Sequence, residues 1–353
     1  MPSVDPFEAL NTGDYVHAEH IFRQRITDNY ATQADIEALS FIYVSYGRYR
    51  SALELLAKVT PLSTLSSSAL YRSGTASIET LEWTTAVEAE TELMRREELS
   101  LSGALEIKSK MVQGDWDSAV RTAASLPIGQ ATPFELGHLI TQLVFELSGQ
   151  VFSPKALEKH WEALNYSEQL SYVQSLLMDG NQTMAGEVLA QFGDKPRCPL
   201  VPAYVSRWHL LHGRRTSARE HALEAMRIGV LVVPAAEILA TLDIRERNTS
   251  SVMLLTSSVL AENPANHICV LRRSHCLSLM KKRREAYAEL RKLLLRNPLE
   301  RYLWIHGAVA AWRAGKFQSG IKLLSKRSRL MHSVERIKST QEFARLVESL
   351  SGV

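Results

Sequence analysis

The densest group of side chains that could do chemistry is a run of four cations, Lys281 to Arg284, in a chain of 353 residues. Ammonium and guanidinium groups are charged hydrogen-bond donors, so the chemistry that they offer is the binding of an anion. Such a run is also typical of a nuclear-import signal, although short basic runs often match by chance. The candidate surface for an anionic partner comprises Arg207, Arg272, Arg273, Lys281, Lys282, Arg283 and Arg284.

The remaining polar motifs give no sign of a reactive centre. His17 and His20 lie three residues apart, but two imidazoles without a third converging ligand make a poor metal site. His209 and His212 precede Gly213, where positive groups suit the negative end of a helix. No P-loop, G-x-S-x-G or H-E-x-x-H motif is present. We expect no metal, no cofactor and no enzymatic activity.

The cysteines and the apolar segments indicate a protein of a reducing compartment. Three cysteines, without a C-x-x-C pair, are too few for a disulfide framework, and the spacing of Cys269 and Cys276 suits the core face of one helix. The first 20 residues lack a basic start followed by an apolar run, so no targeting segment is expected. The apolar patch 228–240 contains Pro234 and Glu237 and is shorter than the ~20 residues that a membrane span needs. We expect a cytoplasmic protein without a membrane span.

Charge is distributed unevenly along the chain. Residues 1–180 contain 13 Lys and Arg against 24 Asp and Glu, a net charge of −11, whereas residues 181–353 contain 28 against 14, a net charge of +14. This asymmetry could arise simply because the solvent-exposed residues of the two halves differ in composition. It could also reflect binding to partners of opposite charge. An acidic protein segment would suit the C-terminal half, and the two halves of different copies would suit each other in self-association.

The elements that must position these residues repeat about every 34 positions. The segment 13–18 (GDYVHA) returns at 47–52 (GRYRSA) and 114–119 (GDWDSA), with glycine, an aromatic residue two positions on, and alanine three positions after it. Glycine ends a helix in the left-handed conformation, the aromatic ring folds back on that helix, and alanine lets two helices approach closely. Related turns follow at intervals of 31 to 35 residues, near positions 13, 47, 81, 114, 149, 180, 213, 247, 281 and 315.

Helical periodicity flanks these turns. Ile36, Leu39, Tyr43 and Tyr46 follow one another at steps of three and four residues, which is typical of the apolar face of a helix. Prolines fall between units, at positions 264 and 298, where one helix must stop before the next begins. No segment favours a strand. The pattern predicts about twenty helices, paired as antiparallel hairpins.

The repeat period and the residue types at its characteristic positions resemble those of the tetratricopeptide repeat family. The matching residues are Leu39, Ser40, Tyr43, Tyr49 and Ala52 in one unit, Ser274, Leu277, Ala286, Leu290 and Pro298 in another, and Trp304, Ala308, Phe317 and Leu324 in the last. The resemblance covers roughly residues 5–332. It implies an all-α fold, an α-solenoid or right-handed superhelix of about ten hairpins with a concave groove. We expect this array over residues 1–332 and a capping helix over 333–353 on its open end.

The resemblance also implies where a groove ligand would bind. Family members that hold a C-terminal carboxylate carry Lys, Arg and Asn at inward positions 13, 10 and 6 residues before the turn. Here those positions hold Ala34, Glu37 and Phe41 in one unit, and Ser68, Tyr71 and Thr75 in the next. The clamp pattern is absent, which favours an apolar or helical ligand.

The function that these observations favour is a non-enzymatic scaffold or adaptor in a larger assembly. Its partners would be proteins with an acidic or amphipathic helical segment. One alternative is RNA binding by a related repeat, although the acidic N-terminal half would repel phosphate. Another is a regulator that senses a peptide, although no DNA-binding helix-turn-helix precedes the array.

Overall fold

The computed structural model describes residues 5–59, 61–126, 134–149, 164–178, 181–192, 198–294 and 301–351. Within these ranges the chain forms twenty α-helices and one short 3-10 helix, and no strand. The all-α class that the sequence predicts is therefore confirmed. No helix among the described residues combines the length and the apolar character needed to cross a bilayer.

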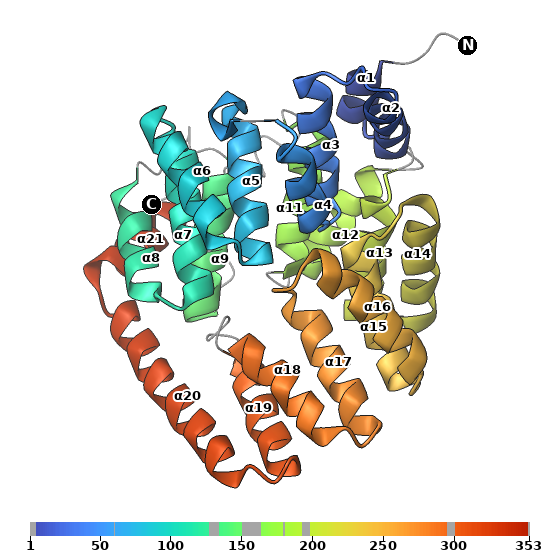
Figure 1. Cartoon of the computed structure of the whole chain (residues 1–353). Coiled ribbons are helices and arrows are strands. Elements are labelled where there is room, and N and C mark those ends of the chain that lie inside the picture. The colour runs from blue at the N-terminus through green and yellow to red at the C-terminus, as the bar shows by residue number, and fades with distance from the viewer. Residues whose placement is uncertain are drawn as a thin grey trace.

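Consecutive helices pack as hairpins along the first half of the chain (Figure 1). The helices are α1 (Pro6–Thr12), α2 (Tyr15–Thr27), α3 (Gln33–Ser45), α4 (Tyr49–Leu56), α5 (Ser67–Thr80), α6 (Trp83–Arg95), α7 (Leu99–Gln113), α8 (Trp116–Ser125) and α9 (Phe134–Ser148). A 3-10 helix, Leu62–Thr64, lies between α4 and α5.

The second half continues the same arrangement. Its helices are α11 (Tyr166–Met178), α12 (Gln182–Gln191), α13 (Leu200–Leu211), α14 (Arg215–Ile228), α15 (Val233–Arg245), α16 (Thr249–Glu262), α17 (His267–Leu279), α18 (Arg283–Leu294), α19 (Arg301–Arg313), α20 (Phe317–Lys338) and α21 (Gln341–Ser351).

The turns inside the hairpins share one backbone conformation. Beyond Gly47, for example, the N–H of Arg48 donates to the carbonyl of Tyr43 at 2.8 Å. This carbonyl lies in the last turn of α3 and has no hydrogen-bond donor within the helix. Residues with φ between 61° and 91° occupy nine of the predicted turn positions: Gly13, Gly47, Leu81, Gly114, Gly149, Gly213, Arg247, Lys281 and Gly315. The predicted turn at Gly180 lies outside the described residues, as does Pro298.

Small residues lie where the two helices of a hairpin cross. The alanines at these positions are at most 5% exposed: Ala18, Ala52, Ala86, Ala119, Ala185, Ala218 and Ala286. At two crossings a serine of the first helix donates to the alanine carbonyl of the second, from Ser206 to Ala218 at 2.5 Å and from Ser274 to Ala286 at 2.9 Å. Close approach of the backbones is thus what makes these hydrogen bonds possible.

Enlarging a crossing residue should therefore destabilise the fold. We expect Ala119→Leu and Ala218→Leu each to lower the free energy of unfolding by roughly 1–3 kcal/mol, because both sites are fully buried and overpacking forces the helices apart. Denaturant titration would measure the loss. Ala288→Leu, at an exposed position of α18, is the matched control and should change stability little. If all three variants unfold alike, the crossing register is wrong.

The N-terminal hairpins pack against hairpins far ahead of them in the sequence (Figure 1). Side chains from α1 to α4 share one apolar core with side chains from α11 to α15. The Val233 N–H donates to the Tyr46 carbonyl at 2.9 Å, and Glu262 accepts from both the N–H and the hydroxyl of Ser51 at 3.0 and 2.7 Å. The superhelix therefore brings its early hairpins onto later ones instead of leaving them as a free end.

The C-terminal helices also return to an earlier part of the chain. α20 spans 22 residues and continues through the boundary expected at residue 332. Val334 and Ile337 of α20, with Phe343 and Leu346 of α21, share an apolar core with α8 and α9 (Figure 1). The terminal helix thus packs on α8, α9 and the C-terminal part of α20, whereas we expected a cap on the open end of the array.

One predicted aromatic contact is wrong. Tyr15 and Trp116 are buried as expected of rings that fold back on the preceding helix, but Phe317 is 63% exposed. The indole of Trp312 occupies the surface beside the start of α20: a Cβ added at Gly320 would meet the Trp312 ring nitrogen. The Phe317 ring therefore lies in solvent, and Trp312 is the aromatic residue that packs against α20 at Gly320.

Candidate partner-binding surface

Cations from two neighbouring hairpins line an open hollow of about 360 Å³ at the C-terminal end of the array. Its lining residues are Lys281, Lys282, Arg283, Arg284, Glu285, Arg313 and Ala314, and we call it the cationic hollow. The first five come from the turn between α17 and α18 and from the first turn of α18, whereas Arg313 and Ala314 end α19. The four predicted cations from Lys281 to Arg284 therefore lie together, and the structure adds Arg313.

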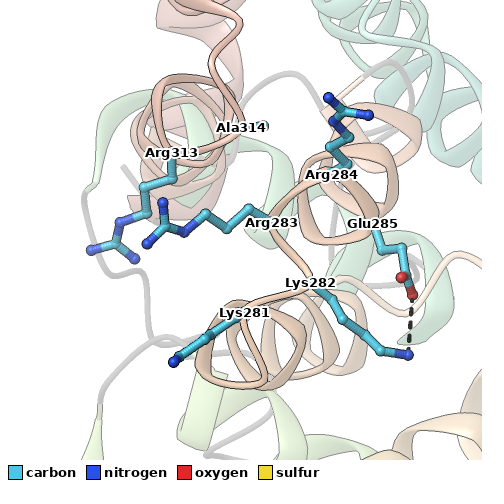
Figure 2. A pocket seen from close by; sticks show the side chains of 7 residues that line it. All are labelled: Lys281, Lys282, Arg283, Arg284, Glu285, Arg313 and Ala314. Atoms are coloured by element: carbon cyan, nitrogen blue, oxygen red, sulfur yellow. Dashed lines mark ion pairs between the residues drawn. The ribbon is translucent and has the colours of Figure 1, made fainter.

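Three of these cations point to the same side of the hollow. In Figure 2 the side chains of Arg283 and Arg313, which both line the hollow, extend to the same side as the Lys281 ammonium. Lys282 lies on the other side, 3.7 Å from the Glu285 carboxylate (Figure 2). Lys281, Arg283 and Arg313 form no ion pair with any residue in the described ranges. An anion from another molecule would therefore reduce the electrostatic repulsion among these three cations.

Carboxylates of the N-terminal half are paired within the chain, in contrast to these cations. Glu92 accepts from Arg95 and Arg96 at 2.7–2.8 Å, and these hydrogen bonds lower the pKa of Glu92 to about 2. Glu79 lies 3.0 Å from Lys108, and the buried Asp35 pairs with Arg25. These carboxylates thus have partners among the cations of the same half, whereas Lys281, Arg283 and Arg313 of the hollow have no such ion pair among the described residues.

Arg207 and Arg272 lie apart from the hollow, near a shared carboxylate. Burial raises the pKa of Glu237 of α15, while a hydrogen bond from Asn266 at 2.6 Å and the charges of Arg207 and Arg272 oppose that rise. Arg272 also donates from its Nε to the Thr241 hydroxyl at 3.0 Å. These two arginines therefore have an internal countercharge.

Arg273 faces a different neighbour. Its Nη1 donates to the Ser257 hydroxyl of α16 at 2.8 Å. The seven predicted site residues thus occupy three places: the hollow, the surroundings of Glu237, and the contact with α16.

Arg272, His306 and Arg313 lie close enough to His275 to influence its protonation. Partial burial lowers the pKa of His275 of α17, and the nearby charges of Arg272, His306 and Arg313 lower it further. Arg313 also lines the hollow. We call Arg272, His275, His306 and Arg313 the basic track.

Sequence reasoning missed Arg313, although a signal for it exists. Arg313 lies two residues before the turn at Gly315, and Lys281 stands at the corresponding turn of the preceding unit. Because adjacent units of a repeat array stack on each other, their turns lie at one edge. Cations near consecutive turns should therefore be counted as one surface, whatever their separation in sequence.

The cysteine thiols are buried and protonated, which leaves them poor nucleophiles. The three cysteines are free and buried. Burial raises the pKa of the Cys198 thiol to about 12 and that of Cys269 well above its usual range, so both stay protonated at neutral pH. Across the described ranges, no group of three or more His, Cys, Asp or Glu side chains is placed to hold a metal ion.

The fold and its turn chemistry define a class of protein. Tandem helical hairpins, turned by left-handed residues and crossed at buried alanines, make a tetratricopeptide-repeat-like α-solenoid. The resemblance seen in the sequence is thereby confirmed at the level of fold.

Comparison with known proteins adds no partner or activity. No protein-family model matches the chain, and no curated protein does. Among solved structures, the Cut9–Hcn1 hetero-tetramer of the APC/C is similar at 14% identity over 98% of this chain and 71% of that one, with a TM-score of 0.45. MamA of AMB-1 is 17% identical over 47% of this chain and 98% of that one, with a TM-score of 0.39. A tetratricopeptide repeat protein from Parabacteroides merdae is 13% identical over 75% of this chain and 96% of that one, with a TM-score of 0.39.

Proposed function

We propose that this chain is a non-enzymatic, cytoplasmic scaffold whose C-terminal hairpins bind an acidic segment of a partner protein. The observation that carries the proposal is the cationic hollow, where Lys281, Arg283 and Arg313 gather without an internal countercharge. Residues 281–338 contain 16 Lys and Arg against 4 Asp and Glu, a net charge of +12 that accounts for most of the positive charge of the C-terminal half. Such a surface attracts an acidic partner and orients it on approach.

The basic track gives the bound segment a direction. Arg313 belongs to both the track and the hollow, so a segment whose carboxylates reach the hollow can continue past His306 and His275 toward Arg272. Ile305, which precedes His306 on α19 and is 44% exposed, offers an apolar contact to an amphipathic segment bound along the track. An acidic, amphipathic helix matches both features.

Reversing the charge of the hollow should slow binding. We expect a variant with glutamate at positions 281, 282, 283 and 284 to associate several-fold more slowly with a fluorescein-labelled acidic amphipathic peptide at low salt. The difference should shrink as added salt shortens the Debye length below about 10 Å. Stopped-flow anisotropy would measure the rates, and unfolding should change by no more than about 0.5 kcal/mol per site because all four side chains are exposed.

The matched control reverses four other exposed cations, Arg214, Arg215, Arg227 and Arg247, and so changes the net charge equally. It should slow association much less, because these residues lie outside the hollow. Equal slowing by the two variants would mean that only net charge matters, and an unchanged rate in the first would exclude the hollow as the binding surface. A single-stranded RNA probe, run in parallel, tests the RNA-binding alternative.

Binding should also strengthen as the pH falls. In the free chain the pKa of His275 is lowered, so its imidazole is neutral at pH 7.5. Carboxylates bound along the track would raise that pKa, so binding takes up a proton and tightens between pH 7.5 and 5.5, by up to about tenfold if the pKa of His275 rises by one unit. Equilibrium anisotropy would measure this, since glutamates of the probe stay mostly ionised above pH ~5. His275→Gln should weaken the pH dependence, and an unchanged dependence would place the probe elsewhere.

A further inference from the structure

The two arginines of the cationic hollow come from different hairpins and present their planar groups to the same space. Arg283 begins α18, Arg313 ends α19, and both side chains line the hollow and extend to the same side of it in Figure 2. A guanidinium donates two parallel hydrogen bonds to one oxyanion. Two arginines that bind one carboxylate must share its two oxygens, as Arg95 and Arg96 share those of Glu92, whereas a phosphate monoester offers three oxygens and a larger negative charge to the same two arginines.

The position of the hollow at the start of α18 adds to this preference. α18 spans 12 residues, and the first N–H groups of a helix have no acceptor within the helix and carry its positive dipole end. The one carboxylate that lines the hollow, on Glu285, is directed away from Arg283 and Arg313 and toward Lys282 (Figure 2). The space between the two guanidinium groups and Lys281 is therefore free of internal negative charge.

We propose that the cationic hollow binds a phosphate monoester, carried by a phosphorylated serine or threonine of the partner segment. The inference rests on the proposed function and names the chemistry of that partner. A phosphate carries a charge of about −1.5 to −2 at neutral pH, which matches the cations Lys281, Arg283 and Arg313. Single-stranded RNA fits the hollow less well, because none of its lining residues is aromatic and no base could stack there.

Three labelled peptides that differ at one position would test the inference on the full chain. Each carries the same acidic background, with phosphoserine, glutamate or serine at its centre, and anisotropy gives the Kd. We expect the phosphoserine peptide to bind at least about tenfold more tightly than the glutamate peptide, because the second guanidinium adds charge-assisted hydrogen bonds. The glutamate peptide should in turn bind more tightly than the serine peptide.

A conservative variant separates the effect of the paired guanidinium hydrogen bonds from the effect of positive charge. Arg283→Lys with Arg313→Lys keeps both positive charges, so the acidic background should still bind, but the preference for phosphoserine over glutamate should fall to within about twofold. Arg215→Lys with Arg227→Lys is the matched control, because both arginines are exposed and lie outside the hollow, and it should keep the full preference. All these side chains are exposed, so each variant should keep the thermal midpoint of the parent chain.

The outcomes distinguish this inference from the proposed function. Equal affinity for the phosphoserine and glutamate peptides would overturn the phosphate site and leave the acidic-segment scaffold standing. A phosphoserine preference that survives the double lysine variant would also overturn it. No binding of any of the three peptides at low salt would overturn both proposals. Tighter binding of single-stranded RNA, or of vesicles containing a phosphoinositide, than of the phosphoserine peptide would assign the hollow to those ligands instead.

Discussion

Replacing Arg219 with methionine is expected to lower the free energy of unfolding by about 3 kcal/mol. Arg219 of α14 lies 2.8 Å from the Asp243 carboxylate of α15, whose side chain is only 5% exposed. Methionine fills much of the volume but leaves that buried carboxylate without a countercharge, and an unpaired buried charge is far more costly than a broken surface pair. Urea or guanidinium titration followed by circular dichroism would measure the loss.

Two further variants separate this cause from a general loss of arginine. Arg121 lies 2.8 Å from Asp117, but both side chains are largely exposed, so Arg121→Met should cost less than about 1 kcal/mol. Asp243→Asn added to Arg219→Met should recover part of the loss, because it removes the unpaired charge and keeps an acceptor for the Ser251 hydroxyl. Equal costs at Arg219 and Arg121, or no recovery in the double variant, would contradict the argument.

Replacing Gly47 with alanine should destabilise the chain by roughly 2–4 kcal/mol. Two causes add. Gly47 has a φ of +79°, which an L-residue adopts at a cost, and its new Cβ would lie 2.8 Å from the Val233 Cβ of α15. The Tyr46 carbonyl beside it accepts a hydrogen bond from the Val233 N–H, so the two segments cannot separate without losing that bond as well.

Gly213 is the matched control for this prediction. It occupies the equivalent turn with a φ of +73°, but no atom lies within 4 Å of the place where its Cβ would stand. Gly213→Ala should therefore cost only the conformational part, about 1 kcal/mol. Thermal or denaturant unfolding of both variants gives the comparison. Similar losses at the two glycines would show that the contact between α3 and α15 contributes little.

The candidate surface was predictable in part. Four adjacent cations, from Lys281 to Arg284, stand out in any reading of the sequence, and the turn that contains them exposes all four. The sequence could not show that Glu285 faces Lys282 while Arg313, 30 residues further on, joins Arg283. Nor could it show that Arg207 and Arg272 lie near Glu237, since side-chain direction depends on how neighbouring helices cross.

By itself the sequence determined the hairpins of this protein, and only the tertiary structure decided how the hairpins close on one another. Glycine at a left-handed turn, alanine at a crossing and an apolar stripe act within some 35 residues, so their spacing alone specifies each unit. The contacts of Gly13 with Tyr166, of Gly47 with Val233, and of α21 with α8 and α9 join residues more than 150 positions apart. They depend on the small rotation between each unit and the next. These rotations accumulate along the superhelix, and no local sequence pattern predicts their total.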